Sequence, residues 1–356
     1  MTRYAAWNRW RTWQSPERRV RGCRTRRGEV VTMHGGTMVN REERLRLAVD
    51  EAQVSPSTEK REKRLALLMR LGFFGSDTRS AVITRAVTVD ELEAAYRLVH
   101  DCLVERGSIE PAPGGLRMRL WEALPEMATF VATVDGQVVG VQSLVTNSPG
   151  LGLPSDVAFR DEIDVLRMGP WPTRAGGGRI VCEATNQAIA PAYRHSAVAT
   201  ELMRCLFAHA LMVGCGELIT AVSPGHSRFY ELLGFETIST VRRGSGDSDA
   251  PAVLMRANVT DLVGRAFEAD DDSDGATLFI KCRCLASNPY REKVRQWDDE
   301  AQGVFADPEG LRRLFVEASG LLSRCSEEER EAVCQSWGAD LFAAVCWAGV
   351  AEVSRA

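Results

Sequence analysis

The spacing of apolar residues between positions 81 and 258 is the feature that most constrains the fold. It switches repeatedly between the period of two that is typical of strands and the period near 3.6 that is typical of helices. The order is strand, helix, hairpin, strand, helix, strand, helix and two further strands. Asp135-Gly136, between two alternating runs, indicates a tight two-residue hairpin turn. This order predicts an α/β (α+β) domain over residues 81–262.

The composition excludes several classes of protein. The chain has 356 residues, of which 45% are hydrophobic and 26% are charged, which is typical of a globular protein. Its longest uncharged apolar stretch, 341–351, is shorter than the roughly 18 residues that a membrane span needs. Ten cysteines without a secretory signal predict reduced thiols and a cytoplasmic location. The net charge of −4 argues against nucleic-acid binding over the whole surface.

The two ends of the chain differ from its centre. Residues 1–40 are rich in arginine and contain three tryptophans, which predicts a basic, unstructured arm. The alternatives are an arm that contacts an acidic surface or an anionic membrane, or a true start at Met33 or Met38. A helical lead-in is expected over 41–80. Helix-capping signals after an acidic stretch predict a linker and a small α-helical region over 263–356.

Two clusters in this C-terminal region were weighed as metal sites. Asp-x-Asp-x-Asp-Gly at 270–275 matches the first half of a calcium loop, but the twelfth position is Lys281, so a solvated linker is the preferred interpretation. The cysteine spacing is not that of a zinc finger, and buried helical cysteines explain it better. These cysteines are Cys282, Cys284, Cys325 and Cys334. The sequence therefore predicts no metal and no permanently bound cofactor.

Three motifs in the central domain indicate its chemistry. Residues 191–199, PAYRHSAVA, resemble the acyl-donor loop R-x-x-G-x-G/A of the GNAT acyltransferases, with Ala197 in place of the first glycine. Residues 223–235, SPGHSRFYELLGF, look like the closing motif of the same fold. The connection 147–178 is about 30 residues long, whereas neighbouring strands are usually joined by about 2 to 6, so it is expected to be functional.

The ordered string of motifs is more specific than any one of them. GLPSD, EIDVLR, VCEATNQAIAP, the modified arginine loop, SPGHSRFYELLGFE and PAVLM together resemble the long-chain N-acyl amino acid synthase family of the FeeM type, over roughly 81–260. The resemblance implies a GNAT-like mixed, mostly antiparallel twisted sheet flanked by helices. It also implies transfer of a fatty acyl group, typically from acyl carrier protein, to the amine of an amino acid.

The resemblance implies a thioester donor, either acyl-phosphopantetheine on acyl carrier protein or acyl-CoA. A carrier protein presents no adenosine pyrophosphate, so the change from glycine to Ala197 costs little with that donor. The expected donor-binding residues are Thr185, Gln187, Ile189, Arg194, Ala197 and Ala199. Surface arginines are commonly only solubilising, but five are candidates for docking an acidic carrier protein. They are Arg194, Arg204, Arg228, Arg242 and Arg243.

Attack of an amino acid's amine on a thioester needs a base and an acid. Glu183, a carboxylate in a partly apolar strand, is the first candidate for the base. It is alternatively a structural partner of Arg167 or Arg179. His226 is a second candidate base, or else a helix cap. Tyr230 is the candidate acid for the departing thiolate, and its alternative role is that of a core aromatic residue.

The substrate site is predicted within the long connection. Arg167 is the expected partner of the acceptor's carboxylate, because a guanidinium binds carboxylates through two parallel hydrogen bonds. Asp164 and Glu162 complete the polar part of this site, and Trp171 is a further candidate for its apolar wall. The apolar residues Leu153, Phe159 and Met168 are candidates to line a groove for the acyl chain. The alternative is that they pack against one another within the loop.

Two competing functions remain at the level of the sequence. The first is a CoA-dependent N-acetyltransferase on the same fold. The second is a non-catalytic GNAT-like binding module that recruits partners through the basic arm and the acidic tail.

Overall fold

The computed structural model describes residues 56–347, apart from 71, 113, 149, 169–179, 244–249 and 271–272. The predicted arm 1–40, most of the lead-in up to residue 55, and Trp171 lie outside the described residues. The chain divides into two compact units, Met1–Arg64 and Leu65–Ala356, and the sheet belongs to the second. No helix in the described part of the chain is long and apolar enough to span a membrane.

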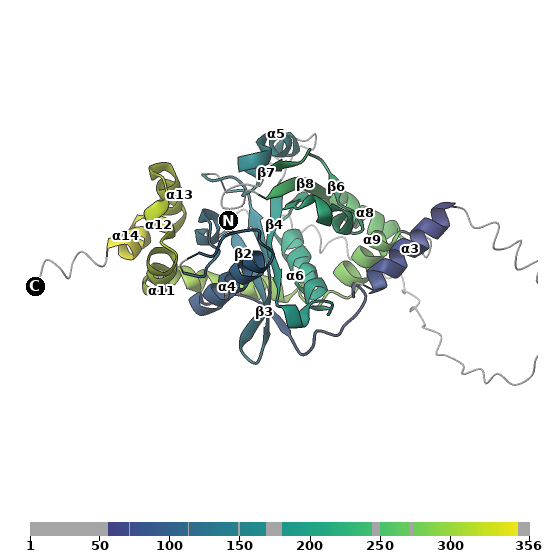
Figure 1. Cartoon of the computed structure of the whole chain (residues 1–356), viewed down its shortest axis with the longest axis horizontal. Helices are drawn as coiled ribbons and strands as arrows, with labels where there is room; N and C mark the ends of the chain where they lie inside the picture. The colour runs from purple at the N-terminus through teal and green to yellow at the C-terminus, as the bar shows by residue number, and fades with distance from the viewer. Residues whose placement is uncertain are drawn as a thin grey trace, which may run out of the picture. The chain divides into compact units, whose positions relative to one another are not determined.

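An eight-stranded sheet forms the centre of the second unit (Figure 1). Its path runs β1-β2-β3-β4-β5-β8-β6, and β7 pairs with β8. Every pair is antiparallel except β4 with β5. The strands are β1 (Val82–Arg85), β2 (Met127–Val134), β3 (Gln137–Thr146), β4 (Val181–Ile189), β5 (Glu217–Val222), β6 (Glu236–Thr237), β7 (Arg242–Arg243) and β8 (Pro251–Asn258). The predicted mixed, mostly antiparallel sheet flanked by helices is therefore confirmed.

Local sequence signals explain where several helices and strands begin or end. Asp135 and Gly136 have φ values of 49° and 77°, the left-handed conformation that a two-residue hairpin turn between β2 and β3 requires. Thr88 caps α4 (Val89–Glu105) through a complete capping box with Glu91. Within the helical lead-in expected over 41–80, the described helix is α3 (Pro56–Arg70).

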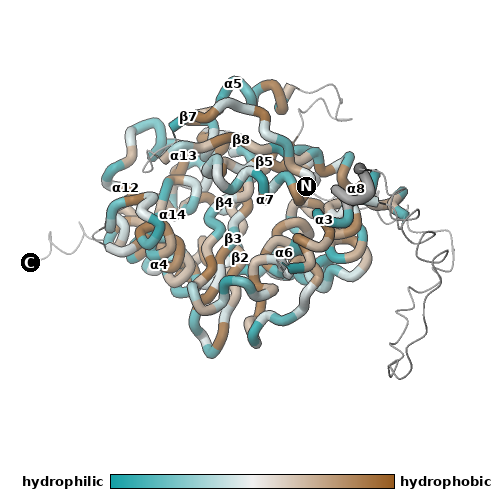
Figure 2. Tube along the Cα trace, turned by 45° about the vertical axis from the view of Figure 1, so that its right-hand side comes forward, coloured by the Kyte–Doolittle hydropathy of each residue, from teal (hydrophilic) through white to brown (hydrophobic). Residues whose placement is uncertain are grey.

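The sheet is covered on both faces. Helix α4 packs on one face and α6 (Val198–Met212) on the other (Figure 1). Helix α6 is hydrophobic over most of its length (Figure 2), because it is buried both against the sheet and beneath later segments. The long connection forms a helix of its own, α5 (Asp156–Arg167), which buries Phe159 and Ile163 against the start of β4 and against β5.

The C-terminal region is built into the same unit. Its first elements pack near α6, and its later ones lie beside α4 (Figure 1). Trp337 also contacts the segment that precedes β2, since its indole nitrogen donates to the carbonyl of Ala123 at 2.6 Å. The elements are α8 (Val259–Glu268), α9 (Gly275–Phe279), the π-helix η4 (Ile280–Ala286), α10 (Lys293–Ala301), η5 (Gln302–Ala306), α11 (Pro308–Arg312), the π-helix η6 (Arg313–Ala318), α12 (Leu321–Arg324), α13 (Glu327–Trp337) and α14 (Ala339–Trp347).

The two clusters weighed as metal sites have other roles where they are described. Asp274 caps α9 by accepting hydrogen bonds from the amides of Ala276 and Thr277, and Asp271 and Asp272 lie outside the described residues. Within the described residues, no group of three or more histidine, cysteine or acidic side chains could hold a metal ion. Cys284 is fully buried beside the sheet domain.

A buried ionic cluster fixes the C-terminal region to α6. The carboxylate of Glu201 accepts hydrogen bonds from Arg204 at 2.5 Å and from Arg283 at 2.8 Å. The hydroxyl of Tyr290 donates to the same carboxylate at 2.8 Å. Arg204 also donates to the carbonyls of Arg283 and Ser287. Because these groups are buried, each depends on its partners for the hydrogen bonds that water no longer supplies.

Replacing Glu201 with alanine is expected to lower the free energy of unfolding by about 3 to 5 kcal/mol, because it leaves buried arginines without their carboxylate. Urea denaturation measures this change. The matched control is Glu93→Ala, which removes an exposed helical ion pair with Arg97 and should change stability by less than about 0.5 kcal/mol. Equal effects of the two substitutions would contradict a structural role for the cluster.

Candidate active site

Strands β4 and β5 run side by side only at their beginnings. Their parallel pairing ends at Glu183 opposite Ile219. From there β5 continues on β8, whereas β4 stays on β3 as far as Ile189 opposite Gly140. The two strands therefore diverge in the middle of the sheet, and the edge of β4 that faces β5 carries no described strand pairing beyond Glu183.

A β-bulge in β4 accompanies this divergence. The register with β3 shifts between Val141 and Ser143, so that one residue of β3, Gln142, opposes two of β4, Asn186 and Gln187. Within the bulge Asn186 has φ 54°, the left-handed region that asparagine tolerates better than most residues. Such a bulge bends a strand and turns its next side chains to the other face, which places both Ala184 and Gln187 against the α6 side.

Two charged residues, the buried Glu122 and the partly buried Arg119, clamp the bulge. The side-chain amide of Asn186 donates to Glu122 at 3.0 Å, and its oxygen accepts from Arg119 at 3.3 Å. Both partners belong to the segment around η1 (Leu120–Ala123). Burial raises the pKa of Glu122, but the charges of Arg119 and Arg117 outweigh it and hold the pKa below its usual value. Glu122 therefore stays ionised, and the clamp is charge-assisted.

Tyr230 stands between the diverging strands. It belongs to α7 (Ser227–Glu231), which follows η3 (Pro224–His226). Its hydroxyl donates to the side-chain oxygen of Gln187 on β4 at 2.9 Å, and it also hydrogen-bonds the hydroxyl of Thr220 on β5. Burial raises the pKa of Tyr230 to about 12, so the phenol keeps its proton at neutral pH. By turning away from Gln187, the hydroxyl can donate this proton to an atom that enters the gap.

Glu183 lies on the opposite face of β4 from Gln187. Its side chain is 3% exposed, and it accepts hydrogen bonds from the amide of Ser155 at 2.9 Å and from the hydroxyl of Ser155 at 2.8 Å. Burial raises the pKa of Glu183 to about 7, although the two bonds from Ser155 oppose the shift. A carboxylate with this pKa can accept a proton near neutral pH. Its described partner is Ser155 at the start of α5, and not Arg167.

Arg167 is held within its own helix and loop. Its guanidinium donates to Asp156 at 2.5 Å, to Asp164 at 2.7 Å and to Asn147 at 2.7 Å. Of the two carboxylates, Asp164 is the more exposed, at 47%. A third predicted substrate residue, Glu162, pairs with Arg242 on β7 at 2.5 Å. These contacts fasten α5 at both ends.

The three apolar residues predicted to line a substrate groove do not lie together. Leu153 and Phe159 are fully buried in the small core beneath α5, whereas Met168 is 75% exposed. Helix α5 thus packs its apolar side on the sheet, which is the self-packing alternative for the first two residues. Their role in binding an acyl chain stays a prediction.

The predicted donor loop is covered by the chain itself. The amide of Ala197, which precedes α6, donates to the backbone carbonyl of Asp77 at 2.8 Å. Arg79 also reaches back to this loop, donating to the carbonyl of Ala192. Arg194 pairs with Glu105, and its Nε donates to the carbonyl of Ile189 at 3.2 Å. The segment 72–80 therefore occupies hydrogen-bonding positions that a pyrophosphate uses at such a helix start.

The remaining predicted residues are placed as follows. Thr185 accepts a hydrogen bond from Arg119 at 3.1 Å, and Ala199, in the first turn of α6, packs against the core. His226 is exposed and hydrogen-bonds Ser223 at 2.9 Å, within its own turn.

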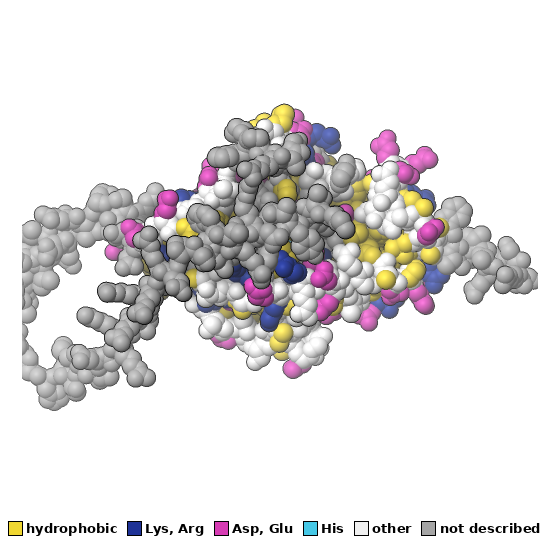
Figure 3. Space-filling model, turned by 180° about the vertical axis from the view of Figure 1, so that it is seen from behind, with side chains coloured by type: hydrophobic (Ala, Val, Ile, Leu, Met, Phe, Trp, Pro, Cys, Tyr) yellow, Lys and Arg dark blue, Asp and Glu magenta, His cyan; other side chains and the backbone are white. Residues whose placement is uncertain are grey.

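The five arginines predicted to dock a carrier protein do not form one patch. Arg204 is 4% exposed and belongs to the buried cluster with Glu201, so its assignment to a docking surface is wrong. Arg194 and Arg242 are paired with Glu105 and Glu162. On the face seen in Figure 3, basic and acidic side chains are interspersed.

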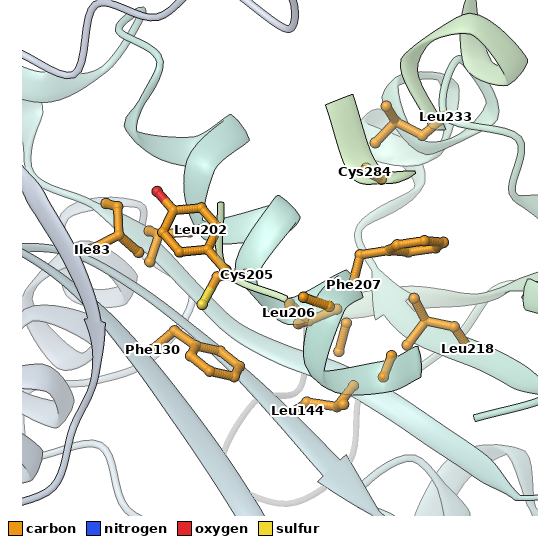
Figure 4. Packing of buried hydrophobic residues seen from close by; sticks show 14 of the residues in the cluster. Ile83, Phe130, Leu144, Leu202, Cys205, Leu206, Phe207, Leu218, Leu233 and Cys284 are labelled. Atoms are coloured by element: carbon orange, nitrogen blue, oxygen red, sulfur yellow. The ribbon is translucent and has the colours of Figure 1, made fainter. Parts of the chain in front are cut away.

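A small apolar cavity of about 40 Å³ lies on the α6 side of the diverging strands. Gln142, Gln187 and Tyr230 supply its polar wall, and the rest of the lining is apolar apart from one thiol. Phe207 of α6 and Leu218 of β5 lie across it from Leu233 and Cys284 (Figure 4). The side-chain oxygen of Gln142 is buried and has no hydrogen-bond partner among the described residues. This cavity joins a hydrogen-bonding wall to an apolar interior.

Sequence reasoning missed the polar framework of this site. Arg119, Glu122, Asn186, Ser155 and Gln142 are separated by up to 67 residues, and only the fold brings them to β3 and β4. The one local signal was the Arg-x-Arg-x-x-Glu run at 117–122, in which charged residues interrupt an apolar stretch. Nothing in the sequence indicates that these charges are buried.

The comparisons with known proteins agree with the motifs. Residues 94–258 match the family model described as N-acyl amino acid synthase FeeM. This match confirms the resemblance that the motifs indicated, and it supports an N-acyltransferase. The matched region contains β2 to β8, with the bulge, Glu183 and Tyr230. The C-terminal region from Val259 onward lies beyond the FeeM match.

Solved structures of similar proteins include FeeM, an N-acyl amino acid synthase from uncultured soil microbes, at 24% identity and a TM-score of 0.43, covering 51% of this chain and 92% of its own. The acyl-homoserine lactone synthase LasI is 16% identical with a TM-score of 0.37, and the match covers 50% of this chain and 89% of LasI. MesI, a CoA-dependent acyl-homoserine lactone synthase, is 16% identical with a TM-score of 0.36, and the match covers 58% of this chain and 97% of MesI. No curated protein sequence matches the chain.

The raised pKa of Glu183 predicts a pH-dependent difference between the wild type and Glu183→Gln. The folded protein holds the proton up to about pH 7, whereas the unfolded chain releases it near pH 4.5. The stabilising contribution of the protonated carboxyl is therefore complete below pH 4.5 and is lost as the pH rises through 7. Relative to Glu183→Gln, which keeps a donor and an acceptor for Ser155, the wild type should lose up to about 3 kcal/mol between these pH values. Urea denaturation at several pH values measures the difference, and a pH-independent difference would contradict the raised pKa.

The left-handed backbone of Asn186 gives a second prediction. Asn186→Ala and Asn186→Gly both remove the bonds to Arg119 and Glu122, but only glycine adopts φ 54° without strain. The glycine variant should be more stable than the alanine variant by about 1 kcal/mol and should retain more acyltransferase activity. Denaturation and turnover measurements compare the two. Equal stability would contradict the left-handed bulge.

Proposed function

We propose that this chain transfers a long-chain fatty acyl group from acyl carrier protein to the α-amine of an amino acid. The observation that carries the proposal is the gap between β4 and β5, where the Tyr230 hydroxyl meets the polar wall of an apolar cavity. A fatty acyl thioester has the matching chemistry, a polar reacting group followed by an apolar chain. The family match over residues 94–258 supports the same class of reaction.

In the proposed reaction the amine attacks the thioester carbonyl from the Glu183 face of β4. A carbon–nitrogen bond forms and the carbon–sulfur bond breaks, which gives an amide and a thiolate. Glu183, with its pKa near 7, accepts the proton that the amine loses, and the phenol of Tyr230 gives a proton to the thiolate. The unpaired edge of β4 beyond Glu183 offers backbone groups to the carbonyl oxygen. His226 is the alternative base, although its described contact is with Ser223.

The covered donor loop favours a carrier protein over CoA. Because the amide of Ala197 already donates to Asp77, a pyrophosphate at the start of α6 would have to displace the segment 72–80. A phosphopantetheine arm carries no such group beyond the single phosphate that joins it to its carrier. The proposed donor is therefore acyl carrier protein, with acyl-CoA as the alternative.

For the acceptor, Arg167 is the proposed partner of the amino acid's carboxylate. Asp164 is its more exposed carboxylate partner, so the acceptor would take the place of Asp164 while Asp156 keeps the guanidinium in position. This exchange conserves the charge pairing of the arginine.

The test is turnover of the purified protein with three donors, a long-chain acyl carrier protein, the same acyl group on CoA, and acetyl-CoA, in the presence of a mixture of amino acids. Mass spectrometry of the products should show N-acyl amino acids formed with the long-chain donors. Glu183→Gln should lower the turnover number by about 10²-fold or more, since proton transfer by a positioned group is worth about 10²- to 10⁴-fold. Tyr230→Phe should lower it by less, because a thiolate is already a good leaving group.

Tyr96→Phe is the matched control for Tyr230→Phe. It also removes a buried hydroxyl, here bonded to Thr129 on the α4 side, away from the gap between the strands. Turnover with acetyl-CoA alone would favour an N-acetyltransferase. Absence of turnover with all donors would favour a non-catalytic binding module. Wild-type activity of Glu183→Gln would exclude Glu183 as the base and favour His226.

A further inference from the structure

The apolar cavity has a wall that the family match does not include. Leu262, Phe279, Ile280 and Cys284 line it, and all four follow residue 258, where the FeeM match ends. They come from α8, from α9 and from the π-helix η4. On the other side, Leu206 and Phe207 of α6 lie within the matched region. The cavity is thus formed jointly by the matched domain and by the C-terminal region.

This wall is rigidly attached to α6. The carbonyls of Arg283 and Ser287, beside and after Cys284, accept hydrogen bonds from Arg204 at 2.9 and 2.5 Å. Asn288 donates back to the carbonyl of Arg204 at 2.8 Å. The ring of Phe279 packs edge-on against Phe73, with the ring centroids 5.2 Å apart. The cavity therefore has a fixed depth, because the wall cannot move without breaking buried hydrogen bonds.

The polar wall shows which end of a ligand enters first. The oxygen of Gln142 is buried, borders the cavity and lacks a described partner, although a buried acceptor without a partner is costly. Gln187 and Tyr230 border the cavity beside it, at the gap where the proposed chemistry takes place. A ligand that brings an amide N–H next to its thioester and an alkyl chain beyond it would satisfy Gln142 and fill the apolar remainder.

We propose that the C-terminal region forms the end wall of the fatty acyl pocket and that Ile280 and Cys284 set the length of the acyl chain. This inference rests on the proposed function for its ligand. Ile280 and Cys284 are four residues apart in η4 and both line the cavity, so a change in either alters the space for the end of the chain. Each methylene that is excluded from an apolar site lowers kcat/KM by about fourfold.

The test compares Cys284→Leu with Cys205→Leu. Both cysteines are fully buried in the same hydrophobic cluster, but only Cys284 lines the cavity. The wild type and variants receive an equimolar mixture of acyl carrier proteins with saturated chains of increasing length, and mass spectrometry gives the product distribution. Cys284→Leu should shift the distribution towards shorter chains, by about fourfold in kcat/KM for each methylene lost, and Ile280→Ala should shift it towards longer chains. Cys205→Leu should keep the wild-type distribution.

Thermal unfolding shows that each variant is folded, and displacement of a fluorescent fatty acid by unlabelled fatty acids of each length measures the pocket without turnover. An unchanged length profile in folded Cys284→Leu, or the same shift in Cys205→Leu, would overturn the inference. If Cys284→Leu shifts fatty acid binding while the wild type transfers no acyl group, the proposed function fails and the end wall stands.

Discussion

The divergence of β4 from β5 is the constraint on which the candidate site depends. Parallel strands normally satisfy each other's backbone groups along their length, yet here pairing stops at Glu183 and Ile219. The bulge at Asn186 bends β4 away, and the ion pair of Arg119 with the buried Glu122 holds that residue in its left-handed conformation. Without the bulge, Gln187 would face the other side of the sheet, and Tyr230 would lose its partner on β4.

The same strand separates the two halves of the proposed reaction. One face of β4 carries Glu183, covered by Ser155 at the start of α5, and the other face borders the apolar cavity with Gln187. An amine and a thioester can therefore approach the strand from opposite sides. The difference in environment also separates the two acid–base groups. Glu183 has a pKa near 7 and Tyr230 one near 12, so the carboxylate can accept a proton while the phenol holds one.

Segments outside the FeeM match lie at both ends of the proposed donor site. Segment 72–80 covers the start of α6 through Asp77, and the C-terminal region closes the cavity at Cys284. Both are fixed by hydrogen bonds and buried packing to α6, the helix that the matched domain itself supplies. The additions therefore shape the proposed donor site, and the strands keep the order that the family motifs imply.

The sequence alone determined the order of the main strands and helices, apart from α5 and one of the three strands after α7, because periodicity is a local signal. Turn chemistry, capping residues and motifs are local too, and they gave the hairpin at Asp135-Gly136, the caps at Thr88 and Ser326, and the family resemblance. The roles of Glu183 as base and Tyr230 as acid stay predictions. Only the tertiary structure decided that these two residues face opposite sides of β4, that Arg204 is buried and that Arg167 is held by Asp156. Those outcomes depend on burial and on partners that are distant in the chain. In addition, a bulge of one extra residue in a strand moves the following side chains to the opposite face of the sheet.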